Sequence, residues 1–314
     1  MDILDFSKNH IEQAQKIVLM NYNEEREIVT NLPAISNVPD LESFADNGLG
    51  VVIKDGDDML GFLCCYKPWG NAFDSKASGT FSPIHAHGAI LKNREAIYQR
   101  LYQSAAEKWV KNNISYHAIS LYAHDIQAVN AFFTYGFGLR CIDAVRPLTN
   151  FEFPSCGGIG FDELSKTEVI KVREMRKLLS QHCGNSPCFM VKSTENFQKW
   201  INRAETRDSR LFVATKDEKP IAFMEVMDDG ENFATEESCM KNICGAFCYP
   251  IYRGKGIVQG LLNYVISRLK AEGYKYLGVD FESFNPTARN FWLKYFAAYT
   301  NGVTRRIDEC ALEE

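Results

Sequence analysis

The stretch Lys241–Asn263, KNICGAFCYPIYRGKGIVQGLLN, decides how the rest of this sequence is interpreted. It begins with a short apolar run that predicts a strand, and it passes through Pro250 into the glycine-rich turn RGKG at 253–256. Apolar residues then recur on one face from Ile257 to Leu269, and Gly273 follows just past them. This pattern predicts a strand, a tight turn and a helix.

The RGKG turn has the composition of an anion-binding site. Gly254 and Gly256 let the backbone turn its N–H groups into one concavity, and the helix that follows adds unpaired amides and the positive end of its dipole. Arg253 and Lys255 add positive charge, so phosphate oxygens fit there. The P-loop pattern GxxxxGK[ST] and the dinucleotide pattern GxGxxG are both absent. An ordinary strand-to-helix connection is the alternative for this turn considered alone.

A second motif lies about thirty residues further on. The sequence Asn285–Trp292, NPTARNFW, directly follows an apparent strand at Tyr276–Glu282. Together with RGKGIV at 253–258, it resembles the GNAT superfamily of acyl-CoA N-acyltransferases, whose signatures are (Q/R)xxGx(G/A) and Asn-x-x-Ala-x-x-aromatic. Val258 departs from the final Gly or Ala of the first signature, and Trp292 stands where the family usually has Tyr.

The resemblance implies that acetyl-CoA is the co-substrate and that it binds in the second half of the chain. Its pyrophosphate would lie on the amides of the turn, its pantetheine arm would pair with the preceding strand, and Asn285 would contact the arm. Asn285 also fits a helix N-cap, and both roles can coexist. The expected cofactor-binding residues are Ala246, Phe247, Cys248, Arg253, Gly254, Lys255, Gly256, Ile257, Val258, Asn285 and Trp292.

The predicted reaction moves an acetyl group from acetyl-CoA to a primary amine of a small molecule or peptide, by direct attack in a ternary complex. Glu282 is the candidate general base, because strand alternation puts it on one face with Asp280 and nearer the end of the strand. A salt bridge or a solvated carboxylate is its structural alternative, and Glu225 is a second candidate. Tyr295 is the candidate acid in place of the missing tyrosine, with packing as its alternative. The thiolate needs little help to leave, since a thiol pKa is about 8.5.

A non-catalytic acyl-CoA-binding or sensing protein is the alternative function. Such a protein would keep the phosphate-binding turn and lose its proton-transfer groups, which Trp292 permits. The acceptor amine cannot be identified from the sequence.

The chain also repeats itself at an offset of 160 residues. Asp125 corresponds to Asn285, Ala128 to Ala288, Asn130 to Asn290, Phe132 to Trp292, Tyr135 to Tyr295 and Arg146 to Arg306. A repeat of this length is a domain. The predicted class is α/β (α+β), with two tandem GNAT-like domains, each a mixed, mostly antiparallel sheet flanked by helices.

The predicted boundaries are a first domain at 1–148, a linker at 149–158 and the acetyltransferase domain at 159–314. The first half has SPIHAHG at 82–88 where the second has RGKG. We therefore predict a degenerate first copy that does not bind acyl-CoA in the usual way; a partner-binding or substrate-recruiting platform is the other interpretation. Predicted strands lie at 1–6, 50–53, 59–66, 80–84, 116–122, 139–147, 159–164, 210–215, 221–227 and 276–282, and helices at 11–26, 41–45, 94–112, 126–135, 168–181 and 194–204.

Composition limits the other possibilities. The chain has 314 residues, of which 46% are hydrophobic and 24% charged, with a formal net charge of −5. This balance argues against nucleic acid or an anionic membrane surface as the main partner. Ten scattered cysteines without a CxxC pair suggest reduced thiols and a cytoplasmic location. No signal peptide or membrane span is expected.

No metal site is expected either. His85 and His87 form a His-x-His pair, but no third ligand lies nearby, so we interpret both as polar loop residues. A homodimer is the assembly to test first.

Overall fold

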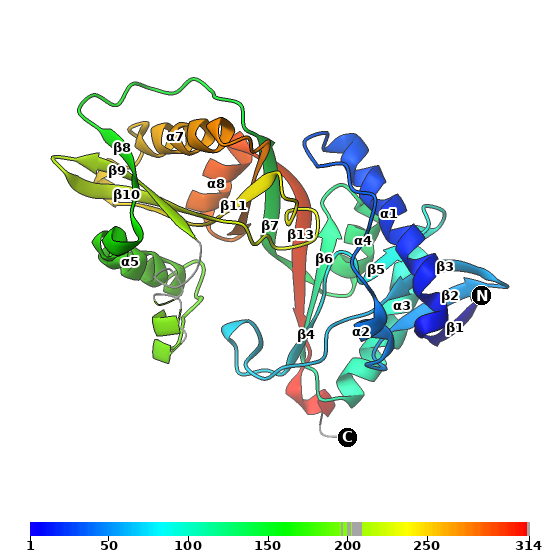
Figure 1. Ribbon diagram of the computed structural model, residues 1–314. Coiled ribbons are helices and arrows are strands. Elements are labelled where there is room, and N and C mark those ends of the chain that lie inside the picture. The colour runs from blue at the N-terminus through cyan, green and yellow to red at the C-terminus, as the bar shows by residue number, and fades with distance from the viewer. Residues whose placement is uncertain (196, 200–201, 203–208, 313–314) are drawn as a thin grey trace. The chain divides into compact units, whose positions relative to one another are not determined.

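The computed structural model describes residues 1–195, 197–199, 202 and 209–312, and Figure 1 shows the course of the chain. The chain divides into two compact units. The first unit contains Met1–Asp143 together with Ala298–Glu314, and the second contains Ala144–Ala297. Each is a mixed α/β structure, as the sequence predicts.

The first unit contains two small sheets. One has the strand order β1-β2-β3-β5 with antiparallel neighbours, and the other has the order β4-β6-β13. Its elements are β1 (Asp2–Asp5), α1 (Ile11–Ile28), α2 (Glu42–Ala45), β2 (Val51–Asp55), β3 (Asp58–Leu63), β4 (Gly79–Ser82), β5 (His87–Ala89), α3 (Arg94–Lys111), β6 (Tyr116–Tyr122), α4 (Ile126–Thr134) and the first part of β7 (Gly138–Pro147).

Helices α1 and α3 cover opposite faces of the first sheet. A Cβ on Gly88 would come 2.7 Å from Ile17 of α1, whereas a Cβ on Gly61 would come 2.8 Å from Ile97 of α3. These close approaches explain why strands β3 and β5 carry glycine where the helices cross them. Trp109 of α3 is fully buried in the core of this unit.

The second unit contains one sheet with the strand order β7-β12-β11-β10-β9-β8. Its elements are β8 (Gly160–Leu164), a 3₁₀ helix (Lys166–Val172), α5 (Arg173–Gly184), β9 (Arg210–Lys216), β10 (Lys219–Met227), β11 (Met240–Cys248), a 3₁₀ turn (Pro250–Tyr252), α7 (Ile257–Ala271), β12 (Tyr276–Glu282), α8 (Pro286–Tyr295) and the start of β13 (Ala297–Arg306). Strands β8 to β11 are antiparallel in sequence order, and β11 runs parallel to β12.

Helices α5 and α7 lie on opposite faces of this sheet (Figure 1). Leu211 and Val213 of β9 pack in one cluster with Met175 of α5. Phe212, between them, points the other way and meets Tyr264 of α7 at a centroid distance of 6.2 Å. Alternation along a strand therefore supplies both helices with apolar contacts.

The internal repeat is visible in the strand register. Gly79–Ser82 pairs in parallel with Tyr116–Ile119, just as Met240–Ile243 pairs in parallel with Tyr276–Val279. The N-caps repeat as well. The Asp125 side chain accepts the N–H of Ala128 at 3.0 Å. The equivalent capping distance, from the Ala288 N–H to Asn285 Oδ1, is 3.4 Å.

The compact units divide the chain differently from the predicted boundaries 1–148 and 159–314. Residues 300–306 of β13 pair with 116–122 of β6 in the first unit, while Ala144–Pro147 of β7 belongs to the second unit. Just beyond β7, the Leu148 N–H donates to the Lys275 carbonyl at 3.0 Å. The two halves of the sequence therefore exchange their last strands.

The segment 149–158, predicted as a linker, packs on α7 within the second unit. The Phe151 N–H donates to Asn263 Oδ1 at 3.1 Å, and Asn150 Nδ2 donates to Ser267 Oγ at 2.8 Å. The Phe151 ring stacks on Tyr295 at 4.6 Å.

Two other predictions need correction. Ser82–Gly88 is not the counterpart of the RGKG turn, because β4 and β5 together correspond to β11, and β5 was missed. The true counterpart of Gly256 is Asn93, since each is the left-handed N-cap of the following helix, with φ of 59° at Asn93 and 78° at Gly256.

The predicted helix 168–181 is a 3₁₀ helix followed by α5. The predicted helix 194–204 lies partly outside the described residues.

Candidate functional site

Strands β11 and β12 lie side by side for only part of their length. Their parallel register ends at Ile243 and Val279. Beyond that point Gly245–Cys248 pairs only with β10 in the described ladder, and the register against β10 shifts at Glu225 and Val226 so that Cys244 is an extra residue. The β12-facing edge of Gly245–Cys248 thus carries backbone groups that no neighbouring strand uses in the described ladder, and we call this open strand edge beside the carboxyl end of β12 the slot.

The RGKG turn stands at one end of this slot. Gly254 and Gly256 both have positive φ, 73° and 78°, which only glycine adopts at little cost. In the described part of the chain, no hydrogen-bond acceptor meets the amide N–H groups of residues 254–258. Helix α7 has no acidic residue in its first turn. A row of unsatisfied amides at a helix N-terminus favours an anion.

The two basic side chains of the turn have different positions. Arg253 folds back on β11, where its Nε donates to the Cys248 carbonyl at 3.0 Å and its guanidinium lies 5.6 Å from the centre of the Phe247 ring. Lys255 is exposed and lies 6.0 Å from the Tyr252 ring. The other side of Gly256 is covered, because a Cβ there would come 2.8 Å from the Pro154 carbonyl oxygen.

The remaining predicted cofactor residues lie on β11 and α7. Ala246 is half-buried, Phe247 packs in the core beside α5, and Ile257 is buried under the turn. Burial raises the pKa of the Cys248 thiol to about 11. Cys248 therefore stays protonated and acts as a small apolar residue.

Asn285 follows the end of β12 and is the N-cap of α8. Its Oδ1 accepts from the Ala288 N–H and from the Thr287 hydroxyl, the latter at 2.8 Å. His182 Nε2, from the end of α5, lies 3.4 Å from the same oxygen and 3.4 Å from Thr287 Oγ1. The amide oxygen is thus occupied by the cap, and the amide nitrogen is the group left to face a ligand. Sequence reasoning missed His182, although it is the only histidine in the second half.

The two predicted catalytic residues lie in different settings. Glu282 is half-buried at the end of β12, and its charge raises the pKa of the Cys183 and Cys188 thiols in addition to their burial. Asp280, two residues earlier, is exposed. Tyr295 packs between Phe151 and the ring of Phe291, whose centroid lies 5.1 Å away. Trp292 is buried against Phe291 and Phe296.

Glu225, the second candidate base, is held in a buried ion pair. Its carboxylate contacts the guanidinium of Arg176 on α5, and each side chain is only 2% exposed. This contact ties α5 to β10 below the slot and favours a structural role for Glu225.

In the first unit, a histidine side chain bridges the two strands at the position equivalent to the slot. His87 on β5 reaches across to β6, where its Nε2 lies 2.6 Å from the Ser120 carbonyl, while its Nδ1 lies 3.0 Å from the Tyr98 hydroxyl. The interpretation of His87 as a polar loop residue is therefore wrong, since it is a buried residue of β5, whereas His85 lies in the turn before β5 and is buried there. In this copy a side chain of the protein itself bridges the two strands.

Two features are absent from the part of the chain that the structure describes. No helix is long and apolar enough to cross a membrane. No group of three or more His, Cys, Asp or Glu residues is placed to hold a metal ion.

Comparison with known proteins finds a family match within the second unit. Residues 175–297 match the model of the acetyltransferase (GNAT) family. A GCN5-related N-acetyltransferase from Sphaerobacter thermophilus has the same fold, with a TM-score of 0.61, 12% identity and coverage of 97% of this chain and 95% of that chain. The structure of a fungal multi-domain GH3 beta-N-acetylglucosaminidase with a glucosamine N-acetyltransferase region gives a TM-score of 0.52 and 12% identity. That match covers 96% of this chain and 38% of the other. No curated protein matches the sequence significantly.

The matched family model makes residues 175–297 an acyltransferase domain. More particularly, the matched region is a GNAT-family acetyltransferase domain, and the slot between β11 and β12 with the RGKG turn lies inside it.

Proposed function

We propose that the second unit transfers an acetyl group from acetyl-CoA to a primary amine of a small molecule or peptide, by direct attack within a ternary complex. The observation that carries this proposal is the row of unsatisfied amides at residues 254–258, placed at the end of the slot that opens where β11 leaves β12. A diphosphate matches the amides, and an extended amide-bearing arm matches the open strand edge.

The slot also suggests how the reactants are positioned. An arm paired with Gly245–Cys248 would bring its thioester toward the end of β12, where Glu282 is half-buried. An unpaired amide on that edge of β11 can polarise the thioester carbonyl, and Glu282 can take a proton from the incoming ammonium directly or through a water. Holding both reactants in this geometry supplies most of the rate enhancement.

Proton delivery to the leaving thiolate is the least demanding step. The thiol pKa is about 8.5, so the thiolate can leave without a general acid near neutral pH. Tyr295 is packed between aromatic rings, and the reaction we propose does not depend on it. His182 lies beside Asn285 and is a further group able to exchange a proton there.

The phosphate-binding role of the turn is tested with Val258→Glu and its matched control Val258→Gln. Val258 is half-buried in the first turn of α7. The helix dipole stabilises a carboxylate at this position, but the carboxylate would compete with a phosphate for the same amides. We expect Val258→Glu to weaken coenzyme A binding about tenfold or more with no loss of thermal stability, because a like charge would lie a few ångströms from the diphosphate.

Isothermal titration with coenzyme A measures this effect, and thiol release from acetyl-CoA over a panel of amines measures turnover. Val258→Gln should bind coenzyme A nearly as well as the natural protein. Equal affinity of the two variants for coenzyme A would show that the turn is not part of the binding site. Binding without turnover on any amine would favour a sensor over an enzyme.

A further inference from the structure

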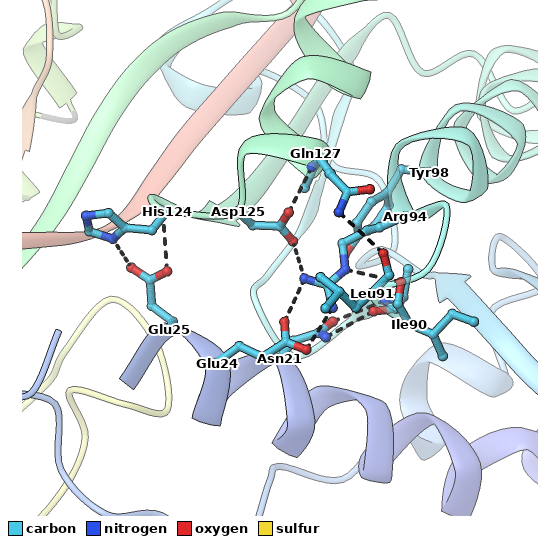
Figure 2. A network of polar contacts seen from close by, with 12 residues as sticks. Asn21, Glu24, Glu25, Ile90, Leu91, Arg94, Tyr98, His124, Asp125 and Gln127 are labelled. Atoms are coloured by element: carbon cyan, nitrogen blue, oxygen red, sulfur yellow. Dashed lines mark hydrogen bonds and ion pairs between the residues drawn. The ribbon is translucent and has the colours of Figure 1, made fainter. Parts of the chain in front are cut away.

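The first unit contains a cavity of about 300 Å³ that the proposed acetyl transfer does not use. It lies where α1, the turn into α3 and the junction of β6 with α4 meet, and Figure 2 shows the polar side chains around it. By the repeat, this place corresponds to the end of β12 in the second unit, with Tyr122 at the position of Glu282.

The polar part of the cavity holds more negative than positive groups. Arg94, only 3% exposed, lies 2.7 Å from Glu24 and 3.0 Å from Asp125. The carboxylate of Glu25, 2% exposed, lies 2.7 Å from Nδ1 of His124 (Figure 2). Burial raises the pKa of Glu25, which pairs with His124, so the charge balance is taken at the other pair of carboxylates. Glu24 and Asp125 share the single guanidinium of Arg94, which leaves one negative charge in excess there.

Tyr122 adds an unsatisfied group to the wall of this cavity. Its side chain is 6% exposed, and its hydroxyl is buried with no hydrogen-bond partner in the described part of the protein. An unpaired buried hydroxyl costs free energy, and a hydrogen-bonding ligand would offset that cost. Burial raises the pKa of Tyr122 far above its usual value, so its oxygen stays neutral and can accept a hydrogen bond.

The mouth of the cavity is apolar. Ile28, Leu91 and Ile126 line it and are 59%, 62% and 62% exposed. Three large aliphatic side chains exposed around one cavity form an unusual surface for a soluble unit. A ligand that covers them must carry a hydrocarbon body.

We propose that this cavity binds an organic cation, a primary ammonium group on a short hydrocarbon body. The ammonium lies over Glu24 and Asp125, and one of its N–H groups donates to the Tyr122 hydroxyl oxygen. The hydrocarbon body lies against Ile28, Leu91 and Ile126. His87 bridges the adjacent slot of this unit, so the cavity is a binding site without an acyl donor beside it. The inference is independent of the activity proposed for the second unit.

Three probes of equal length test the chemistry: n-hexylammonium, 1-hexanol and hexanoate, titrated calorimetrically into the full chain in the absence of coenzyme A. We expect hexylammonium to bind at one site roughly tenfold or more tightly than hexanol, because the unit charge faces two carboxylates that share one guanidinium. Hexanoate should show no binding. Equal affinity for the ammonium and the alcohol would overturn the proposal.

The site is located with the pair Ile126→Lys and Ile126→Gln. Both remove the apolar side chain from an exposed position, but only lysine places a cation at the mouth. Hexylammonium should bind Ile126→Lys about tenfold more weakly than Ile126→Gln. Glu24→Gln should weaken binding to a similar degree, and thermal denaturation of each variant reports whether it folds.

Because the second unit is itself proposed to accept amines, the same titration is made with Glu282→Gln. Unchanged hexylammonium binding is expected, and loss of binding there would assign the ligand to the second unit and overturn the site. Acetyl transfer by Ile126→Lys, measured in parallel, reports on the second unit alone. A failure of one proposal is thus distinguished from a failure of the other.

Discussion

At the scale of single residues, Glu282 and Asp280 form a natural test of the chemistry. They lie on one face of β12, but Glu282 is half-buried at the slot whereas Asp280 is exposed. We expect Glu282→Gln to lower kcat by about 10²–10⁴, the usual contribution of a general base, with little change in coenzyme A affinity. Asp280→Asn is the matched control and should keep kcat within about twofold.

The pH profile of kcat adds a second criterion for Glu282. A base that must be ionised gives a rate that falls as pH drops through its pKa, and Glu282→Gln should abolish that limb. If the glutamine variant keeps both the rate and the profile, proton removal belongs to another group, and His182 is then the first residue to replace.

Glu225 and Arg176 predict a different outcome, in stability. Each is 2% exposed, so removing one partner takes a buried counter-charge away from the other. We expect Glu225→Gln or Arg176→Met alone to lower the free energy of unfolding by about 3–5 kcal/mol, and the double variant Arg176→Met with Glu225→Leu to recover much of it. Chemical denaturation measures both. A Glu225→Gln variant of normal stability that lacks acetyl transfer would make Glu225 the base.

At the scale of elements, buried histidines in the first unit predict sensitivity to acid. Burial lowers the pKa of His85, His87 and His117 to about 4, against an ordinary value of 6.5. A lowered folded-state pKa contributes stability above the unfolded-state value, and this stability is lost as pH falls through the folded-state value. The first unit should therefore lose stability between about pH 6.5 and 4.

Hydrogen exchange of β6 against that of β12, followed from pH 7 to pH 4, measures this difference between the units. His117→Gln in the natural chain should reduce the pH dependence of β6 protection, because one of the three groups no longer titrates. Equal loss of protection in β6 and β12 over this range would contradict the prediction.

The elements also show what the sequence could predict. Strand Tyr276–Glu282 and helix α7 were predicted with nearly the observed bounds, because their apolar periods are regular and Gly256 and Gly273 bracket the helix. Strand β5 was missed, since three residues, His87–Ala89, are too short to show a period. The RGKG turn was recognised from its glycines, and its phosphate-binding role stays a proposal. His182 was missed because its neighbours Asn285 and Thr287 are about a hundred residues away in sequence.

At the scale of the whole molecule, the exchange of terminal strands could not be predicted. Strands β7 and β13 occupy corresponding places in the repeat, so either could complete either sheet by pattern alone. In the structure, residues 300–306 of β13 pair with β6, and Val303 is fully buried in the core of the first unit. Neither half of the sequence therefore contains a complete unit.

This exchange predicts how truncation acts. A chain ending at Ala297 keeps the second unit but deprives β6 of its antiparallel neighbour, leaving a row of unpaired backbone groups and an exposed core. We expect the amides of Tyr116–Tyr122 to lose most of their protection from hydrogen exchange, while coenzyme A binding by the second unit persists. A chain ending at Asp308 removes only the terminal 3₁₀ helix, which has no buried residues, and should keep β6 protected. Adding the peptide 298–314 to the shorter chain should restore protection, whereas full protection without the peptide would mean that the first unit completes its sheet from its own half of the sequence.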